Sequence, residues 1–264
     1  MYYDSNKLYS AFTIHSNLKR IYGINVNHKR VERLMSIYDL KSVFRKKKTH
    51  HYNKTKPEET AENILNRNFS PERPNEVWLT DITEDHIGTH KEYICTVFDP
   101  FDNMPISQVS STRNDTTLTN EALDKAHDLY PEATPMFHSD RGFQFTRAVF
   151  KHKLKELGYT QSMSRVSRCI DNSPMECFQG VMKDEMKILF PYTTAEEYRQ
   201  SLDKYLHHYI YERPQRRFKG KTPFEVRSES LNKENPQTYP TLKNYGVIKY
   251  WNKINTINQQ GTAL

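Results

Sequence analysis

Three short apolar segments follow one another between residues 77 and 111, and their order constrains the fold of this 264-residue chain. They cover residues 77–82, 93–98 and 106–111, and turn residues separate the last two. Successive strands joined by short turns pair antiparallel. Helical spacing of apolar residues then alternates with two further strand-like segments as far as the helix that starts near residue 194. This order predicts an α/β fold, a mixed sheet flanked by helices.

A small helical domain is predicted ahead of the sheet. Residues 10–21 place apolar side chains at helical spacing, Gly23 ends that pattern, and Asn27 is suited to cap a second helix. Two short helices around a glycine turn, the second one basic, are typical of a helix-turn-helix DNA-binding module. The apolar faces would comprise Ala11, Ile14, Leu18, Ile21, Val31, Leu34, Met35 and Tyr38. The candidate DNA contacts on the second helix are Lys29, Arg30 and Arg33.

Charge is distributed unevenly along the chain, and the net charge of +7 conceals this. Residues 1–50 hold 11 basic and 3 acidic residues, residues 76–212 hold 14 and 22, and residues 213–228 hold 6 and 1. The two basic parts are suited to the phosphate backbone of DNA. A basic surface that is merely solvated is the alternative. The candidate contacts in the second basic part are Arg213, Arg216 and Arg217.

Cysteine content and hydropathy indicate a cytoplasmic protein without a membrane partner. The three cysteines form no CxxC pair, which fits a reducing compartment and excludes a disulfide scaffold. No apolar segment approaches the length of a transmembrane helix, and the first residues lack the apolar centre of a signal peptide.

Three acidic residues stand out by their predicted positions. Asp81 lies within the first strand, Asp140 directly follows the fourth, and Glu176 lies in the first turns of a helix that starts near residue 173. Each alone has a structural explanation, such as an edge residue or helix-dipole stabilisation. Strand ends and a helix start can converge in an α/β fold, however, and three neighbouring carboxylates repel one another. Carboxylate oxygens are ligands that Mg²⁺ prefers, so the set indicates a divalent metal site.

The motifs around these acids resemble the DDE-type transposases, in particular the OrfB product of bacterial insertion sequences, which has a retroviral-integrase-like core. Residues 78–83 (WLTDIT), 138–144 (HSDRGFQ) and 171–178 (DNSPMECF) carry the likeness. Between Asp81 and Asp140 lie 58 residues, and between Asp140 and Glu176 lie 35, the latter being the spacing that this family keeps. Residues 23–35 resemble the family's helix-turn-helix, and residues 209–213 with 221–225 resemble its closing motif.

The resemblance implies a ribonuclease H-like core and four parts of the chain. These are a helix-turn-helix DNA-binding domain at residues 1–48, a linker at 49–75, an integrase-like catalytic core at 76–228 and a C-terminal extension of unknown role at 229–264. Within the linker we expect a short helix at residues 59–66.

The implied activity is metal-dependent DNA strand cleavage and strand transfer, without a covalent enzyme intermediate. Asp81, Asp140 and Glu176 would bind two Mg²⁺ or Mn²⁺ ions about 3.5–4 Å apart around the scissile phosphate. Lys183 would share a helix face with Glu176 and contact phosphate, unless it is simply solvated, and Gln144 would touch DNA. The implied partners are terminal-repeat DNA and target DNA in the bacterial nucleoid. The resemblance also implies a homo-oligomer in the synaptic complex and an upstream-frame product with which the chain is fused or associated.

Two other functions stay open at this stage. One is a non-catalytic helix-turn-helix protein with a decayed core, since residues 165–170 lack the glycine that is frequent in the family. The other is a nuclease of the same fold that hydrolyses DNA without joining it. We further interpret Asp99 and Asp102 as turn residues and Asn172 as a helix N-cap.

Overall fold

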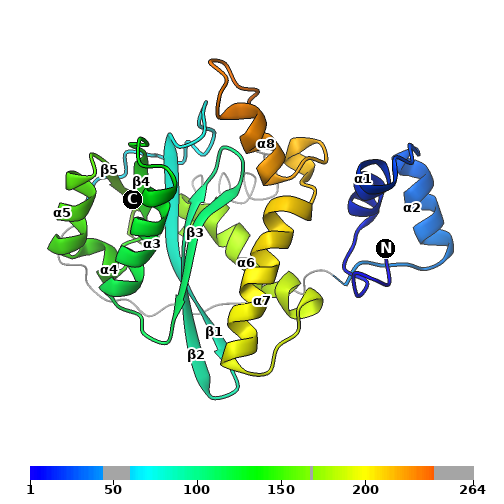
Figure 1. Ribbon diagram of the computed structural model, residues 1–264, viewed down its shortest axis with the longest axis horizontal. Coiled ribbons are helices and arrows are strands. Elements are labelled where there is room, and N and C mark those ends of the chain that lie inside the picture. The colour runs from blue at the N-terminus through cyan, green and yellow to red at the C-terminus, as the bar shows by residue number, and fades with distance from the viewer. Residues whose placement is uncertain (44–59, 167–168, 241–264) are drawn as a thin grey trace, which may run out of the picture.

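A computed structural model describes residues 1–43, 60–166 and 169–240 of the chain (Figure 1). The end of the predicted helix-turn-helix domain, the first part of the predicted linker and the end of the C-terminal extension lie outside the described residues. The N-terminal helices are α1 (Ala11–Tyr22) and α2 (His28–Ile37). The strands are β1 (Val77–Ile87), β2 (His90–Asp99), β3 (Met104–Ser111), β4 (Met136–Ser139) and β5 (Thr160–Met163). The later helices are α3 (Thr116–Leu129), α4 (Phe143–Thr146), α5 (Ala148–Glu156), η1 (Cys169–Asn172), α6 (Ser173–Leu189), α7 (Ala195–His207), η2 (His208–Glu212), η3 (Arg216–Phe218) and α8 (Pro223–Ser230).

The five strands form one mixed sheet in the order β3-β2-β1-β4-β5. β1, β2 and β3 pair antiparallel as consecutive strands, whereas β4 and β5 run parallel to β1 and are reached through helices. The mixed sheet flanked by helices confirms the fold class predicted from the order of apolar segments. The first hairpin is longer than predicted, because β1 and β2 stay paired out to Ile87 and His90.

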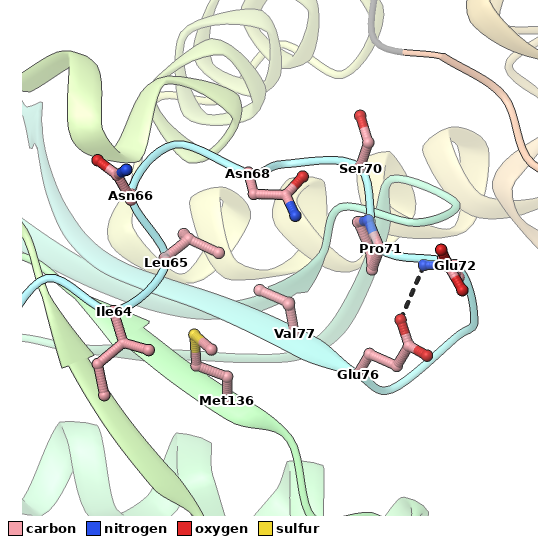
Figure 2. Close-up of a pocket in the computed structure, with 10 residues that line it drawn as sticks. All are labelled: Ile64, Leu65, Asn66, Asn68, Ser70, Pro71, Glu72, Glu76, Val77 and Met136. Carbon is pink, nitrogen blue, oxygen red and sulfur yellow. Dashed lines mark hydrogen bonds between the residues drawn. The ribbon is translucent and has the colours of Figure 1, made fainter.

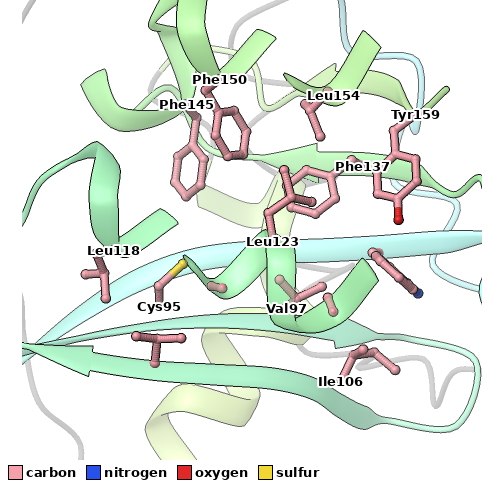
Figure 3. Packing of buried hydrophobic residues seen from close by; sticks show 14 of the residues in the cluster. Cys95, Val97, Ile106, Leu118, Leu123, Phe137, Phe145, Phe150, Leu154 and Tyr159 are labelled. Atoms are coloured by element: carbon pink, nitrogen blue, oxygen red, sulfur yellow. The ribbon is translucent and has the colours of Figure 1, made fainter. Parts of the chain in front are cut away.

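Alternating side chains of β1 serve two separate cores, one on each face of the sheet. Trp78 is fully buried with residues of α3 and α5, and Leu79 is fully buried with residues of α6 and α7. Figure 3 shows the first of these cores, in which Phe145 and Phe150 lie above Val97 of β2. Burial on both faces explains why the central strands have nearly continuous apolar sequences rather than alternating ones.

The N-terminal domain forms the two predicted helices. The side chain of Asn27 accepts a hydrogen bond from the backbone N–H of Lys29, which is the expected cap, and Gly23 adopts φ 66° at the end of α1. The predicted apolar faces are only partly buried, because Ile21, Leu34 and Tyr38 are exposed while Val31 and Met35 are buried. No helix in the described part of the chain is long and apolar enough to cross a membrane.

An arginine of α1 joins this domain to the sheet domain. The Arg20 guanidinium donates to Glu225 Oε1 of α8 at 2.8 and 3.0 Å and to the backbone carbonyls of Tyr211 and Glu212. Asn6 donates a further hydrogen bond to the carbonyl of Ile188 at the end of α6. The helix-turn-helix domain therefore contacts the core through α8, η2 and α6 (Figure 1).

The linker helix expected at residues 59–66 is wrong for the described residues 60–64, which are not helical. Their backbone instead forms hydrogen bonds with β5 at the edge of the sheet. The carbonyl of Glu62 accepts from the N–H of Met163, and the N–H groups of Ile64 and Leu65 donate to Ser162 Oγ. Bonding to an exposed strand edge outweighs local helix propensity here.

Asp99 and Asp102 do more than form the turn between β2 and β3. Each accepts backbone hydrogen bonds in that turn, as expected, but both side chains are fully buried against the Arg227 guanidinium of α8, at 2.6 and 2.8 Å. Burial raises the pKa of Asp102 to about 7, although Arg227 opposes this shift. The three groups fasten α8 to the sheet.

We expect Arg227→Met to lower the free energy of unfolding by about 3–5 kcal/mol, because it leaves two buried carboxyl groups without their cation. The loss should be greater at pH 8 than at pH 5. A carboxyl group whose pKa is raised in the folded chain binds more protons in the folded than in the unfolded state, so stability falls as pH rises towards the folded pKa. Removing Arg227 raises the folded pKa values of Asp99 and Asp102 further, so the loss of stability continues to higher pH.

Urea unfolding at the two pH values measures this effect. Arg113→Met is the matched control, because Arg113 is exposed and pairs with Asp115 on the surface. Its change should stay within about 0.5 kcal/mol. A loss in Arg227→Met that does not depend on pH would contradict the role assigned to the buried acids.

Candidate active site

Strand register brings the first two predicted acids together. Leu79 of β1 is the paired residue of His138 in β4, and the strands run parallel, so Asp81 and Asp140 each lie two residues further along. Neighbouring strands are about 4.8 Å apart. Asp81 also shares the face of Leu79, which is the face that α6 covers.

The third acid reaches the same place on α6. The side-chain amide of Asn172 donates to the backbone carbonyl of Thr80 at 3.0 Å, which fixes the start of α6 beside Asp81. Glu176 lies four residues later, on the same side of the helix. Asn172 precedes the helix as expected, but its side chain makes no capping hydrogen bond, so the predicted capping role is wrong and the bond to Thr80 replaces it.

The three carboxyl groups interact electrostatically. Burial raises the pKa of Asp81 well above its ordinary value, and the charges of Asp140 and Glu176 raise it further. Burial also raises the pKa values of Asp140 and Glu176, and the Asp140 charge adds to the shift at Glu176. Backbone N–H groups of Ile82 and Gly142 each donate to one oxygen of the nearest acid. The site thus concentrates negative charge at one edge of the sheet.

The donor set suits a hard divalent cation, since it consists of carboxylate oxygens whose mutual repulsion a cation would offset. The side chains as placed do not form a ready ligand cage: among the described residues, no group of three or more His, Cys, Asp or Glu side chains is arranged to hold a metal ion. Asp81 and Asp140 are each turned towards a backbone N–H, at 2.8 Å in both cases. Rotation of these side chains would redirect their oxygens.

Lys183 is a cation that interacts with this charge. It lies on α6 seven residues after Glu176, its Nζ donates to the carbonyl of Glu84, and its charge lowers the pKa of Asp81. Burial lowers the pKa of Lys183 itself, although Asp85 opposes the shift. The predicted placement on the helix face of Glu176 is therefore present, while DNA contact by Lys183 stays a prediction.

Three of the other predicted DNA contacts are engaged inside the protein. Arg213 forms two hydrogen bonds with the Glu185 carboxylate, at 2.7 and 2.8 Å. Arg217 donates to the carbonyls of Pro100 and Tyr239, and Gln144 is buried and donates to Asn114. The side chains that remain exposed are Lys29, Arg30, Arg33 and Arg216.

A surface hollow lies elsewhere on the described part of the chain (Figure 2). It has a volume of about 490 Å³ and is lined by eight residues between positions 64 and 76, together with Val77 and Met136, the first residues of β1 and β4. Asp81 lies near the middle of β1 and Asp140 directly follows β4, so both lie just beyond the residues through which the two strands pair in parallel. The acids therefore occupy the carboxyl edge of the parallel strands, where ligands of open α/β sheets bind.

Comparison with known proteins identifies the family of this chain. The integrase core domain family matches residues 71–169 and, in a second description, residues 157–223, and an HTH-like domain family matches residues 1–48. The Escherichia coli putative transposase InsK for insertion sequence element IS150 is 35% identical over 231 residues, which cover 87% of this chain and 81% of that protein. The chain belongs to the insertion-sequence transposases with an integrase core.

Other relatives of the transposase agree. A Haemophilus influenzae transposase-like protein is 35% identical over 79% of this chain and 96% of its own length. A Shigella flexneri probable transposase for IS1353 is 31% identical over 85% of this chain but only 44% of its own length.

Solved structures confirm the ribonuclease H-like fold of the transposase. A chain of the simian T-cell lymphotropic virus intasome aligns with a TM-score of 0.57 over 89% of this chain and 80% of its own, at 13% identity. The HTLV-2 integrase catalytic core domain in complex with magnesium aligns with a TM-score of 0.50 over 59% of this chain and 97% of its own, at 18% identity.

The sequence does not reveal the partners of the buried residues that surround the triad. His138 is fully buried, with ring nitrogens bonded to Ser162 and Ser164, and burial lowers its pKa to about 4. Asp171 is also fully buried and is bonded to Arg67 and Arg165. Both lie within the family motifs, so their position was a usable signal, but only the fold reveals their partners.

We expect Asp81→Asn to stabilise the metal-free transposase by about 1 kcal/mol, because it removes one charge from a repelling set while its oxygen can still accept from Ile82. Adding Mg²⁺ should raise the melting temperature of the wild type and not that of the variant. Differential scanning calorimetry with and without Mg²⁺ measures both effects, with Asp128→Asn, an exposed site on α3, as the control. A variant less stable than wild type in the absence of metal would contradict the repulsion.

Proposed function

We propose that Asp81, Asp140 and Glu176 are the catalytic metal ligands of this transposase, and that it cleaves and joins the DNA ends of its own insertion sequence. The placement of three carboxylates from β1, β4 and α6 at one sheet edge, each with a raised pKa, supports the proposal. The family's integrase core and helix-turn-helix domains already indicate DNA as the partner and divalent metal as the cofactor.

Two bound Mg²⁺ or Mn²⁺ ions would activate the attacking oxygen and stabilise the leaving 3′-oxygen of the scissile phosphate. The chain itself supplies positioning. Strand register sets Asp81 beside Asp140, and the Asn172 amide holds α6 so that Glu176 faces them. Lys183, on the same face of α6, would direct the phosphate backbone towards the acids. The attacking group is water in cleavage and a DNA 3′-OH in strand transfer, so the chain need not supply a nucleophile.

The exposed basic side chains of α2 would grip the terminal repeat, while Arg216 would extend the contact on the core. Lys29, Arg30 and Arg33 form no ion pair with any described residue, so their charges are free for phosphate. Because two DNA ends must be brought together, we further propose that the transposase acts as a homo-oligomer. We also propose that it associates with an upstream-frame product.

Replacement of any one triad acid by its amide (Asp81→Asn, Asp140→Asn or Glu176→Gln) should reduce strand transfer at least about 1,000-fold, because each acid supports several kcal/mol of metal-based transition-state stabilisation. The assay follows terminal-repeat DNA joined to a target duplex in Mn²⁺. Asp128→Asn is again the control and should retain wild-type activity.

The products of the same assay separate the alternatives. Joined strands support the transposase, cut ends without joining would indicate a nuclease of the same fold, and DNA binding without strand chemistry in any metal would indicate a decayed core. Full activity in the triad variants would contradict the site.

Replacement of Lys29, Arg30 and Arg33 together by alanine should weaken binding to terminal-repeat DNA and should lower the salt dependence of log K by about 1 for each lost phosphate contact. Fluorescence anisotropy across a salt series in EDTA measures this binding apart from catalysis. Lys125→Ala, on α3, is the control because Lys125 pairs with Glu121 on the surface. An unchanged salt slope would contradict DNA contact by α2.

A further inference from the structure

Asp171 is a fully buried carboxylate to which the proposed mechanism gives no task. Arg165 donates three hydrogen bonds to it, from its backbone N–H, Nε and Nη2, at 3.0, 2.8 and 2.9 Å. Arg67 Nε donates at 2.6 Å, and Asn63 Nδ2 at 3.0 Å. Burial alone would raise the pKa of Asp171, but these hydrogen bonds hold it far below its ordinary value. Because both oxygens are saturated, Asp171 is not a further metal ligand.

Two of these donors come from a segment distant in sequence, residues 61–69, which we call the strap. The strap lies along β5, where the Glu62 carbonyl accepts from Met163 and two strap N–H groups donate to Ser162 Oγ. Leu65 of the strap is buried in the same core as Met175 of α6. The strap is therefore part of the core's structure rather than a free linker.

Ser162 links the strap to the strand that carries Asp140. Its oxygen accepts from Ile64 and Leu65, which uses both lone pairs, so its own proton must go to His138 Nδ1 at 2.9 Å. His138 Nε2 then carries the ring proton and donates to Ser164 at 3.2 Å. This neutral tautomer agrees with the lowered pKa of His138.

Asp171 lies directly before the residue that holds α6. Asn172 donates to the carbonyl of Thr80, and Glu176 follows one helical turn later. A restraint at Asp171 is therefore transmitted to Glu176 through a few residues of helix. Each acid of the triad is close in sequence to a hydrogen-bonded residue of this network. Asp140 is two residues after His138, Asp81 directly follows Thr80, and Glu176 is one helical turn after Asn172.

We propose that Asp171 is a positioning residue, and that its ion pair with Arg67 of the strap sets the place of Glu176 relative to Asp81 and Asp140. The inference rests on the proposed function of the triad. It makes the strap a determinant of the turnover rate without giving any strap residue a catalytic role.

The test uses the full chain and replaces Arg67, because a change at buried Asp171 also disturbs Arg165. Arg67→Met removes the guanidinium, Arg67→Lys keeps the charge, and Arg73→Met is the matched control, an exposed arginine of the adjoining segment. The first readout is amide hydrogen exchange in metal-free protein, and the second is the split between kcat and KM in strand transfer. Asp81→Asn serves as the inactive reference.

In Arg67→Met we expect faster exchange confined to residues 171–180 and a kcat lower by on the order of 10-fold, with KM for DNA unchanged. Arg67→Lys should lie between this variant and the wild type, and Arg73→Met should match the wild type. Wild-type exchange and kcat in Arg67→Met would overturn the proposal, as would faster exchange spread evenly over the sheet. If the wild type joined no DNA, the proposed function would fail, whereas the exchange measurement would still decide whether Arg67 holds the start of α6.

Discussion

Repulsion among three carboxylates at one edge of the sheet is the constraint on which the rest of this structure depends. Asp81, Asp140 and Glu176 come from three elements, and each has its pKa raised by burial. Without metal, nothing local favours bringing them together. The two apolar cores, one on each face of the sheet, supply the stability that offsets this cost. Functional sites commonly hold such strain where the surrounding fold determines the geometry.

The hydrogen bonds around the acids come from neutral groups, which hold the acids in place and leave their negative charge available to a metal ion. A cationic side chain bonded directly to the triad would relieve the repulsion but would also compete with metal. The amide of Asn172 and the backbone N–H groups of Ile82 and Gly142 hold the elements and side chains in place without adding a full charge. The arginines near the start of α6, Arg67 and Arg165, bond to Asp171 rather than to the triad, and Asp171 offsets one of their two positive charges.

Local pattern predicted the fold from the sequence, because it depends on residues close together in the chain and on strand order. The family motifs selected three acids that interact electrostatically in the fold, and their role as metal ligands stays a prediction. Long-range pairing was not predictable in this way. The net charge of residues 213–228 indicated DNA contact, yet Arg213 is paired with Glu185, and Arg217 is bonded to backbone carbonyls. A count of basic residues cannot show which of them already have acceptors within the fold. Asp99 shows the same limit, since its turn role was local and its pairing with Arg227 was not.

The internal use of those basic residues has its own consequence for DNA binding. Arg227 fastens α8 to the β2–β3 turn, and Glu225, on the same short helix, accepts from Arg20 of the helix-turn-helix domain. α8 thus connects the domain that would grip DNA to the sheet that would cut it. A helix of eight residues has little stability of its own, so its buried ion pairs are what make it a firm support. Residues 213–228 therefore help to hold the two domains in a defined relation, and the proposed phosphate contacts that remain exposed are Arg216 and the cations of α2.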